Sequence, residues 1–258
     1  QGGDDAKLLA GGHSLLPLMK LRFAAPGLLV DLKNVPGLKG IETGNGAGTK
    51  IGALTTHAMI QADDSLGLPS AAAKLIADQQ VRNRGTIGGS LAHGDPASDL
   101  PTVLLAMDGR VTARGPNGER EIAAADLFQD YLTTAVAADE VLTDVRLPSM
   151  EGYRHAYLKF SRRSEDWAMV GVAALVRGTD TFEDVRIGLT HMGSTPLRAT
   201  QVEQALIGQP IEAGRIRAAA EAAAEGTDPP GDLNATPDYK RELARVLVRR
   251  ALEQAAAI

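Results

Sequence analysis

The sequence AGGHSLLPLMKLR, residues 10–22, opens with paired glycines that are soon followed by a serine, and TIGGSLAHGDPASDLP, residues 86–101, contains a similar pair. Consecutive glycines allow neighbouring backbone N–H groups to turn toward one point, and a serine hydroxyl adds a further donor. Two such turns predict a site for the two phosphates of a dinucleotide. Two ordinary tight turns remain the alternative, because glycine pairs alone are common.

The composition is typical of a globular protein and excludes several kinds of site. Hydrophobic residues make up 44% of the chain, and 27 Lys and Arg stand against 32 Asp and Glu, which gives a net charge of -5. We therefore expect no nucleic-acid partner, since such a surface is usually basic. The chain has no cysteine, which excludes disulfides, cysteine-ligated zinc and iron–sulfur clusters held by this chain. No spacing of His, Asp and Glu predicts a metal site.

The hydropathy pattern predicts no membrane span. No apolar run reaches the roughly 18–20 residues that a membrane helix needs, and no signal peptide is recognisable. We expect a cytoplasmic protein, associated with a membrane at most through a complex. The chain starts at Gln1 without Met, and we expect that an N-terminal segment is missing.

Hydrophobic periodicity and turn residues predict a mixture of helices and strands before residue 150. The predicted strands cover residues 7–10, 28–32, 41–42, 50–54, 110–114, 119–122 and 141–147, and the strand at 28–32 is expected to be buried. The predicted helices cover residues 13–23, 56–62, 70–78 and 100–107. Residues 81–99 are the least regular stretch, and Asn117-Gly118 predicts a hairpin turn.

The pattern changes near Glu151, and we place a domain boundary between Pro148 and Tyr153. Residues 1–150 form one predicted domain and residues 151–258 a second. The second domain is predicted to begin with three antiparallel strands, at 153–160, 169–176 and 185–190, and to end with helices at 198–207, 211–225 and 237–256. Thr236 is the expected N-cap of the last helix.

Several common motifs are absent. No G-x-G-x-x-G opens a strand–turn–helix unit, and no G-x-x-x-x-G-K-[ST] is present, so neither a standard nicotinamide site nor a P-loop is predicted. No G-x-S-x-G nucleophile elbow occurs. We assign no catalytic residue.

Three longer segments carry a resemblance to a known family. AGGHSLLPLMKLR (10–22), TIGGSLAHGDPASDLP (86–101) and YLKFSRRSEDWAMVGVAA (157–174) resemble the FAD-binding subunit of molybdenum hydroxylases. Within that family the chain is most similar to the medium subunit of enzymes of the carbon monoxide dehydrogenase type, and xanthine dehydrogenases carry a related domain. The resemblance spans the chain and adds FAD as the expected cofactor.

The resemblance implies an α+β fold. A two-subdomain FAD-binding fold of the vanillyl-alcohol-oxidase type, with its break near residues 33–40, would precede a C-terminal domain of a three-stranded antiparallel sheet and helices. Two features depart from the family. About two dozen residues that normally precede Gln1 are absent, and Ser90 stands where relatives have Asn or Asp.

The same resemblance implies which residues bind FAD. The two glycine turns would wrap the pyrophosphate, Asp99 would bond the ribityl or flavin region, Lys159 would lie near the flavin, and Tyr157 would cover one face of its ring. The full set of expected binding residues is Ala10, Gly11, Gly12, His13, Ser14, Leu15, Thr86, Ile87, Gly88, Gly89, Ser90, Asp99, Tyr157 and Lys159. The backbone turn, rather than an imidazole, is what the position of His13 requires, and Trp167 is expected to pack at the domain junction.

The implied function is electron transfer within an oxidoreductase complex. A large partner subunit would hold molybdopterin and a small one the [2Fe-2S] clusters, in a dimer of heterotrimers, and the absence of cysteine here fits that division. Carbon monoxide is the leading substrate. The alternatives are an aromatic, heterocycle or xanthine-type hydroxylase subunit, a stand-alone FAD oxidase of the same fold, and a scaffold without flavin.

Overall fold

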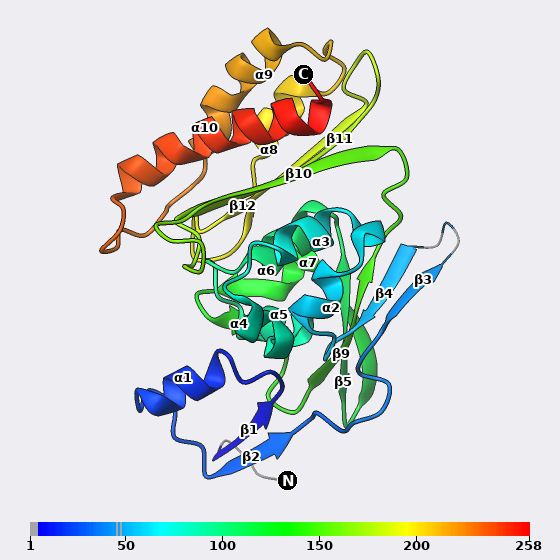
Figure 1. The fold of residues 1–258 in the computed structure, drawn as a ribbon, viewed down its shortest axis with the longest axis vertical. Coiled ribbons are helices and arrows are strands. Elements are labelled where there is room, and N and C mark those ends of the chain that lie inside the picture. Colours follow the sequence, from blue (N-terminus) through cyan, green and yellow to red (C-terminus); the bar gives the residue numbers. More distant parts are fainter. Residues whose placement is uncertain (1–4, 45, 47) are drawn as a thin grey trace.

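The computed structural model describes residues 5–44, 46 and 48–258. Near the N-terminus, strand β1 (Ala6–Leu9), helix α1 (Leu15–Lys20) and strand β2 (Leu28–Asp31) form a small unit at one end of the molecule (Figure 1). β1 and β2 pair in parallel. The prediction that β2 is a buried strand is wrong, because all four of its residues are exposed. A two-stranded sheet has no further strand beside it and too little apolar surface around it to bury its side chains.

A five-stranded antiparallel sheet forms the centre of the first half. Its order is β3-β4-β9-β5-β6, with β3 at Ile41–Gly44, β4 at Gly48–Gly52, β5 at Arg110–Gly115, β6 at Gly118–Ala123 and β9 at Val141–Leu147. β5 and β6 are joined by the predicted hairpin, in which Gly118 has a φ of +111°. A short helix α7 (Ala124–Leu127) and a small hairpin of β7 (Phe128–Asp130) and β8 (Thr133–Thr134) link β6 to β9.

Helices cover this sheet on the side of the C-terminal half (Figure 1). They are α2 (His57–Gln61), α3 (Leu68–Ala73), α4 (Gln79–Arg84), α5 (Ile87–His93) and α6 (Asp99–Ala106), with a 3-10 turn at Asp64–Leu66. The predicted helix at 70–78 is misplaced, since α3 begins at Leu68 with Pro69 in its first turn and ends at Ala73. Thr56 caps α2 as predicted, accepting from the Met59 N–H.

The stretch at 81–99 is not irregular, because it contains most of α4 and all of α5. Asp78 caps α4 by accepting from the Val81 N–H, and Thr86 caps α5 by accepting from the Gly89 N–H. Burial of Ile87 and Leu91 in the core then outweighs the low helix propensity of the two glycines between them.

The C-terminal sheet has four strands rather than the predicted three. β10 (Tyr153–Phe160), β11 (Val170–Arg177) and β12 (Asp184–Thr190) are followed by β13 (Leu197–Arg198), all antiparallel. β13 has only two residues, too few to show a period of two in the sequence. It pairs with β12, where Gly188 stands opposite Arg198.

This sheet is buried on both faces. Val170, Val172 and Val176 of β11 pack toward the C-terminal helices, whereas Ala173 and Leu175 join the core of the first half. The C-terminal helices are α8 (Thr200–Leu206), α9 (Ala213–Ala220) and α10 (Pro237–Ala256), with a 3-10 turn at Glu221–Ala224, and they cover the outer face (Figure 1). α10 has its predicted bounds, and its N-cap accepts from the Tyr239 N–H.

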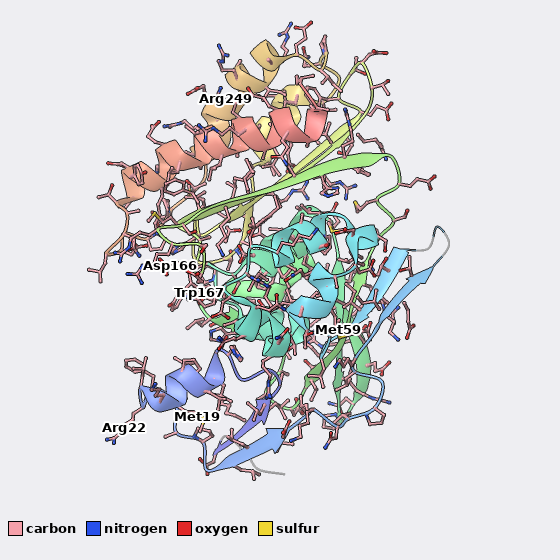
Figure 2. The ribbon with its side chains drawn as sticks, viewed as in Figure 1. Met19, Arg22, Met59, Asp166, Trp167 and Arg249 are labelled. Atoms are coloured by element: carbon pink, nitrogen blue, oxygen red, sulfur yellow. The ribbon has the colours of Figure 1, made fainter. Side chains whose placement is uncertain are left out.

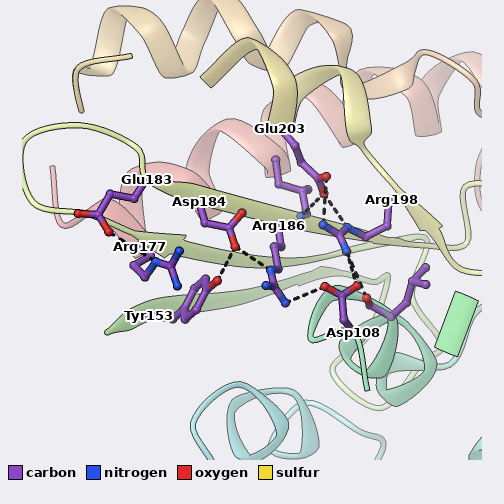
Figure 3. A network of polar contacts seen from close by, with 10 residues as sticks. Asp108, Tyr153, Arg177, Glu183, Asp184, Arg186, Arg198 and Glu203 are labelled. Atoms are coloured by element: carbon purple, nitrogen blue, oxygen red, sulfur yellow. Dashed lines mark hydrogen bonds and ion pairs between the residues drawn. The ribbon is translucent and has the colours of Figure 1, made fainter. Parts of the chain in front are cut away.

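A network of ion pairs joins the two halves beside this sheet (Figure 3). Asp108, just after α6, pairs with Arg186 of β12 at 2.7 Å and with Arg198 of β13 at 3.0 Å. Arg198 also pairs with Glu203 at 2.7 Å, and one Glu203 oxygen accepts from the Ile187 N–H. The network therefore fixes the sheet of one half against the end of a helix of the other.

Candidate cofactor site

A cavity of about 750 Å³ lies where the β1–α1 turn meets α2, α4, α5 and the loop between β10 and β11. Most of the residues predicted to bind a cofactor line it: Ala10, Gly11, Gly12, His13, Ser14, Leu15, Thr86, Gly88, Gly89, Ser90, Asp99 and Lys159. Ile87 and Tyr157 are the exceptions, because both are buried in the hydrophobic core. Two segments 70 residues apart in the sequence thus meet at one cavity.

The first glycine turn presents free backbone donors to this cavity. Gly12 has a φ of +80°, which glycine adopts without strain. The chain then enters α1. The Leu16 N–H donates to the Gly12 carbonyl oxygen at 2.9 Å, which forms the first hydrogen bond of this turn. Within the described part of the chain, no group accepts a hydrogen bond from the N–H groups of residues 12–15. Unpaired N–H groups at such a turn suit an anion.

The second glycine turn works differently, and the prediction that its N–H groups form an anion site is wrong. The Ile87 and Gly88 N–H groups donate to the carbonyls of Thr55 and Ala53 at 3.0 and 2.8 Å. The Gly89 N–H donates to the Thr86 hydroxyl oxygen at 3.2 Å, and the Ser90 N–H to the Thr86 carbonyl at 3.0 Å. All four N–H groups at the start of α5 therefore already have acceptors within the protein.

The glycines of both turns leave room that a side chain would fill. A Cβ on Gly11 would overlap the Arg84 carbonyl oxygen, so this residue lets β1 pack against the end of α4. A Cβ on Gly89 would lie 2.8 Å from the Thr86 hydroxyl and 3.7 Å from the Cβ of Ala10. The two turns therefore face each other closely, and Gly89 keeps open the space between them.

Asp99 and Lys159 form a buried ion pair in the wall of the cavity. Their side chains are 3% and 4% exposed, and the Lys159 ammonium lies 3.1 Å from Asp99 Oδ2. The ammonium also donates to the Leu75 carbonyl at 3.0 Å. Burial raises the pKa of the Asp99 carboxyl, and the Lys159 charge opposes that rise. Lys159 is thus a partnered cation and not a free one.

Tyr157 supports this pair from behind the wall. Its hydroxyl donates to Asp99 Oδ1 at 2.7 Å and lies 3.4 Å from the Thr190 hydroxyl, which donates to the Thr102 hydroxyl at 2.8 Å. Gly171 leaves the space for this contact, because a Cβ there would come within 2.8 Å of the Tyr157 oxygen. Burial raises the pKa of the Tyr157 phenol well above its usual value, so the hydroxyl stays a donor.

Three histidines line the cavity. His57 is 6% exposed, its Nδ1 is buried without a hydrogen-bond partner among the described residues, and burial lowers its pKa to about 4. Burial also lowers the pKa of His93. The exposed His13 donates from Nδ1 to the Gly11 carbonyl at 3.0 Å, so its ring braces the backbone turn.

Trp167 lines the cavity although it was not among the residues predicted for the site. It lies beside the junction of the two halves but does not pack there as predicted, because it is 56% exposed and lines the cavity together with Glu165 and Asp166. Figure 2 shows Asp166 and Trp167 at the edge of the molecule where the C-terminal sheet meets the helices of the first half. The available signal in the sequence was a lone tryptophan within a loop of charged residues, and this signal is weak because single exposed apolar residues are common.

The residues present fit FAD. The volume lies within the range of roughly 300–1,000 Å³ that small-molecule sites occupy. Residues 12–15 offer unpaired N–H groups for a phosphate segment, and the cradle at Gly89 would be filled by a Cβ. Apolar side chains, among them Leu54, Ile76 and Leu142, line other parts of the cavity and suit flat ring systems.

Comparisons with known proteins agree with this fit. Residues 1–150 match the family described as the FAD binding domain in molybdopterin dehydrogenase, and residues 155–255 match the CO dehydrogenase flavoprotein C-terminal domain. The chain is 42% identical to the carbon monoxide dehydrogenase medium chain of Hydrogenophaga pseudoflava, over 100% of this chain and 91% of that relative. It is 41% identical to the 6-hydroxypseudooxynicotine dehydrogenase complex subunit alpha of Paenarthrobacter nicotinovorans, over 98% and 88%.

The fold agrees as well. A solved structure of carbon monoxide dehydrogenase from Hydrogenophaga pseudoflava superimposes with a TM-score of 0.96 at 43% identity, covering 100% of this chain and 91% of that one. In the part of the chain that the structure describes, no helix combines the length and the apolar character needed to cross a membrane.

Proposed function

Because this chain belongs to the family of FAD-binding subunits of molybdenum hydroxylases, we propose that it is the medium subunit of a carbon monoxide dehydrogenase. The chain is an oxidoreductase subunit whose cofactor is FAD. It serves electron transfer between the iron–sulfur clusters of a partner and an external acceptor. The single observation that carries the assignment is the cavity at which both glycine turns meet, inside a fold that matches the family along its whole length.

The residues divide the binding of FAD between them. The N–H groups of residues 12–15 hold the pyrophosphate, and the hydroxyls of Ser14 and Ser90 add donors. The glycines at 88 and 89 contribute close packing and space rather than N–H groups. Bound flavin supplies the redox chemistry, and the protein supplies position and electrostatics.

The Asp99–Lys159 pair orients the end of the cofactor that lies beneath the β10–β11 loop. Since the ion pair carries no net charge, it orients the cofactor through the hydrogen bonds that its two side chains can still form, and not through an unpaired positive charge. Tyr157 acts through Asp99, because its ring lies in the core and its hydroxyl bonds the Asp99 carboxylate and contacts Thr190. The chain therefore provides binding and orientation without a catalytic residue of its own.

The fold assignment within the first 150 residues follows the same proposal. The β1–α1–β2 unit and the five-stranded sheet with its helices correspond to the two subdomains of a vanillyl-alcohol-oxidase-type fold, with the break near residues 33–40. Residues of both units line the cavity, and this supports the assignment of two subdomains. The C-terminal domain begins after residue 150 and supplies Lys159 and Trp167.

The proposed partners are a large subunit that holds molybdopterin and a small one that holds [2Fe-2S] clusters, assembled as a dimer of heterotrimers. The chain cannot supply thiolate ligands, because it has no cysteine. Co-purification of a tagged chain with two further subunits, one of them with the absorption of an iron–sulfur protein, tests this assembly. Isolation of an active FAD oxidase consisting of this chain alone would contradict it.

The proposed substrate of the complex is carbon monoxide, supported by the 42% identity to a carbon monoxide dehydrogenase medium chain. A second candidate, an N-heterocyclic compound, is supported by the 41% identity to a subunit of the 6-hydroxypseudooxynicotine dehydrogenase complex. Dye reduction by the purified complex, with carbon monoxide and with N-heterocycles in parallel, distinguishes the two. Reduction by the heterocycle alone would replace the first assignment.

A further inference from the structure

The loop between β10 and β11 places the only tryptophan of the chain at the cofactor cavity. Trp167 is 56% exposed and lines both this cavity and a neighbouring one of about 290 Å³, to which His191 and Asp232 also contribute. The loop has no regular secondary structure. An exposed ring on such a loop needs an anchor if it is to keep one position.

The side chain of His191 forms a hydrogen bond with Ala168, the residue next to Trp167. Its Nδ1 lies 2.7 Å from the Ala168 carbonyl oxygen, directly after Trp167 in the chain. Its backbone N–H donates to the Pro96 carbonyl at 2.9 Å, in the loop between α5 and α6. His191 therefore ties the tryptophan loop to the loop that precedes Asp99.

The backbone of His191 is held in an unusual conformation. Its φ is +63°, in the left-handed region that residues other than glycine rarely occupy. Such a conformation costs energy and persists where the surrounding structure imposes it. Glycine or asparagine would adopt it more easily, which makes both useful replacements.

Two contacts agree on which nitrogen of His191 carries the proton, one with the Ala168 carbonyl and one with Lys240 of α10. A carbonyl oxygen only accepts, so Nδ1 is the donor toward Ala168 and Nε2 of the neutral ring carries a lone pair. The Lys240 ammonium, fully buried, lies 3.4 Å from Nε2 and donates to the Pro230 carbonyl at 2.8 Å and to Asp232 at 2.7 Å. Burial and the Lys240 charge lower the pKa of the His191 ring.

We propose that His191, which donates from Nδ1 to the Ala168 carbonyl and faces Lys240 through Nε2, is a positioning residue that fixes this carbonyl and thereby the Trp167 indole at the wall of the cofactor cavity. The consequence for FAD binding rests on the proposed function, namely that this cavity holds FAD. The anchoring of the indole does not depend on it, and the two are measured separately.

The direct test uses the fluorescence of Trp167 in the full chain without cofactor. His191→Gly removes the imidazole and relieves the backbone at φ +63°, so the variant is expected to fold. Its indole should show lower fluorescence anisotropy and stronger quenching by acrylamide than the parent. His191→Asn is the matched control, because its side-chain amide replaces the Nδ1–H donor and asparagine tolerates this φ. It should keep the parental values.

FAD titration of the same proteins gives the second readout. Loss of one positioning hydrogen bond should raise the FAD dissociation constant of His191→Gly roughly three- to tenfold, and His191→Asn should remain within about twofold of the parent. If the parent itself binds no FAD, the proposed function fails while the anisotropy comparison still decides the role of His191. Parental anisotropy in His191→Gly, or equal loss in His191→Asn, would overturn the proposal.

Lys240→Met tests whether the Lys240 charge acts on the His191 ring. The charged groups that act on His191 are Lys240, Asp232 and Asp95, and Arg162, Arg163 and Asp166 line the same small cavity. Removing the ammonium raises the pKa of His191, so the acid-induced change in Trp167 emission should move to higher pH than in the parent. A midpoint that stays in place would show that the Lys240 charge does not act on the His191 ring, and the role of Lys240 in the proposal would be abandoned.

Discussion

The Asp99–Lys159 pair shows how a buried contact changes the role that a residue can have in a binding site. Resemblance to the family placed both residues near the cofactor, and the structure adds that they neutralise each other, with almost no exposure to water. A paired lysine of this kind contributes less positive potential to the cavity than a free one. Its removal leaves an unpaired carboxylate in a buried site, which is strongly unfavourable.

Lys159→Met should therefore destabilise the chain by about 3–5 kcal/mol, as measured by urea unfolding at neutral pH. The double variant Lys159→Met with Asp99→Asn should recover much of that loss. Lys33→Met, which breaks an exposed pair with Asp31, is the control and should cost less than about 1 kcal/mol. Equal effects of the two single substitutions would contradict the buried pair.

The reduction potential of bound FAD gives a second measure of the same pair. Lys159→Met leaves the negative Asp99 alone and should lower the potential, because negative charge opposes the arrival of electrons. The double variant should return toward the parental value. A redox titration that finds the double variant as low as the single one would show that the lysine charge acts independently of Asp99.

His57 predicts a specific dependence of stability on pH. Its pKa is lowered from 6.5 to about 4 in the folded chain, so the unfolded state takes up the proton first as the pH falls. The contribution of His57 is complete above pH 6.5 and is lost progressively down to about pH 4, in total roughly 3 kcal/mol.

In His57→Gln, the slope of the unfolding free energy against pH should become smaller in that window. The decrease should correspond to at most one fewer proton taken up on unfolding. Met59→Gln, at a half-buried position of the same helix, controls for the added amide. Urea unfolding at several pH values provides the measurement. An unchanged slope in His57→Gln would mean that the ring takes up its proton at the same pH in the folded and the unfolded chain.

At the scale of elements, the first glycine turn is the central device of the site. Gly12→Val forces a branched side chain into a φ of +80° and places it against Leu16. The free N–H groups of residues 12–15 would then be misplaced. Since two charge-assisted hydrogen bonds contribute at least about 1.5 kcal/mol each, FAD affinity should fall roughly a hundredfold or more.

Two controls separate this effect from backbone strain. Gly208 has a φ of +79° with no atom near its Cβ position, so Gly208→Val should reduce stability without affecting FAD titration. His13→Ala should change affinity far less than Gly12→Val, because the side chain only braces the turn. If Gly12→Val bound FAD like the parent, or if His13→Ala lost it as completely, the turn would not hold the pyrophosphate.

Elements differ in how well the sequence predicted them. α10 was predicted with its bounds because Thr236, Pro237 and a long amphipathic stripe mark them locally. α5 was missed because Gly88 and Gly89 suggest a turn, whereas tertiary burial of Ile87 and Leu91 decides the helix. β13 was missed because two residues carry no periodicity.

The candidate site was predicted well in its membership and less well in its chemistry. The motifs led to residues that now line one cavity, but which N–H groups are free depends on carbonyls of Ala53 and Thr55, far away in the sequence. The location of Tyr157 behind Asp99, and of Trp167 at the cavity, likewise depends on how the C-terminal sheet packs on α6. No local pattern carries that information.

At the scale of the whole molecule, several large apolar side chains remain exposed on the β1–α1–β2 unit. Leu21 and Phe23 are 64% and 80% exposed, and Leu28 is 48% exposed. A partner that binds only the folded chain adds stability by mass action. We therefore expect a higher unfolding midpoint in the assembled complex than in the isolated chain.

Thermal unfolding of both forms at matched FAD concentration tests this expectation. The transition of this chain can be followed within the complex through the fluorescence of its bound flavin. Raising the concentration of the partners should raise the midpoint further, since the stabilisation depends on free partner. Equal midpoints at all concentrations would show that assembly contributes nothing to the stability of the chain.

The central claim is that the cavity between the two glycine turns holds FAD, and equilibrium binding with the visible absorption spectrum of flavin tests it most directly. The full chain, purified alone or within its complex, should bind one FAD with a perturbed flavin spectrum, and Gly12→Val should lose that binding while Gly208→Val retains it. A parent chain that remains colourless at saturating FAD, or a Gly12→Val variant with the parental spectrum and affinity, would contradict the account.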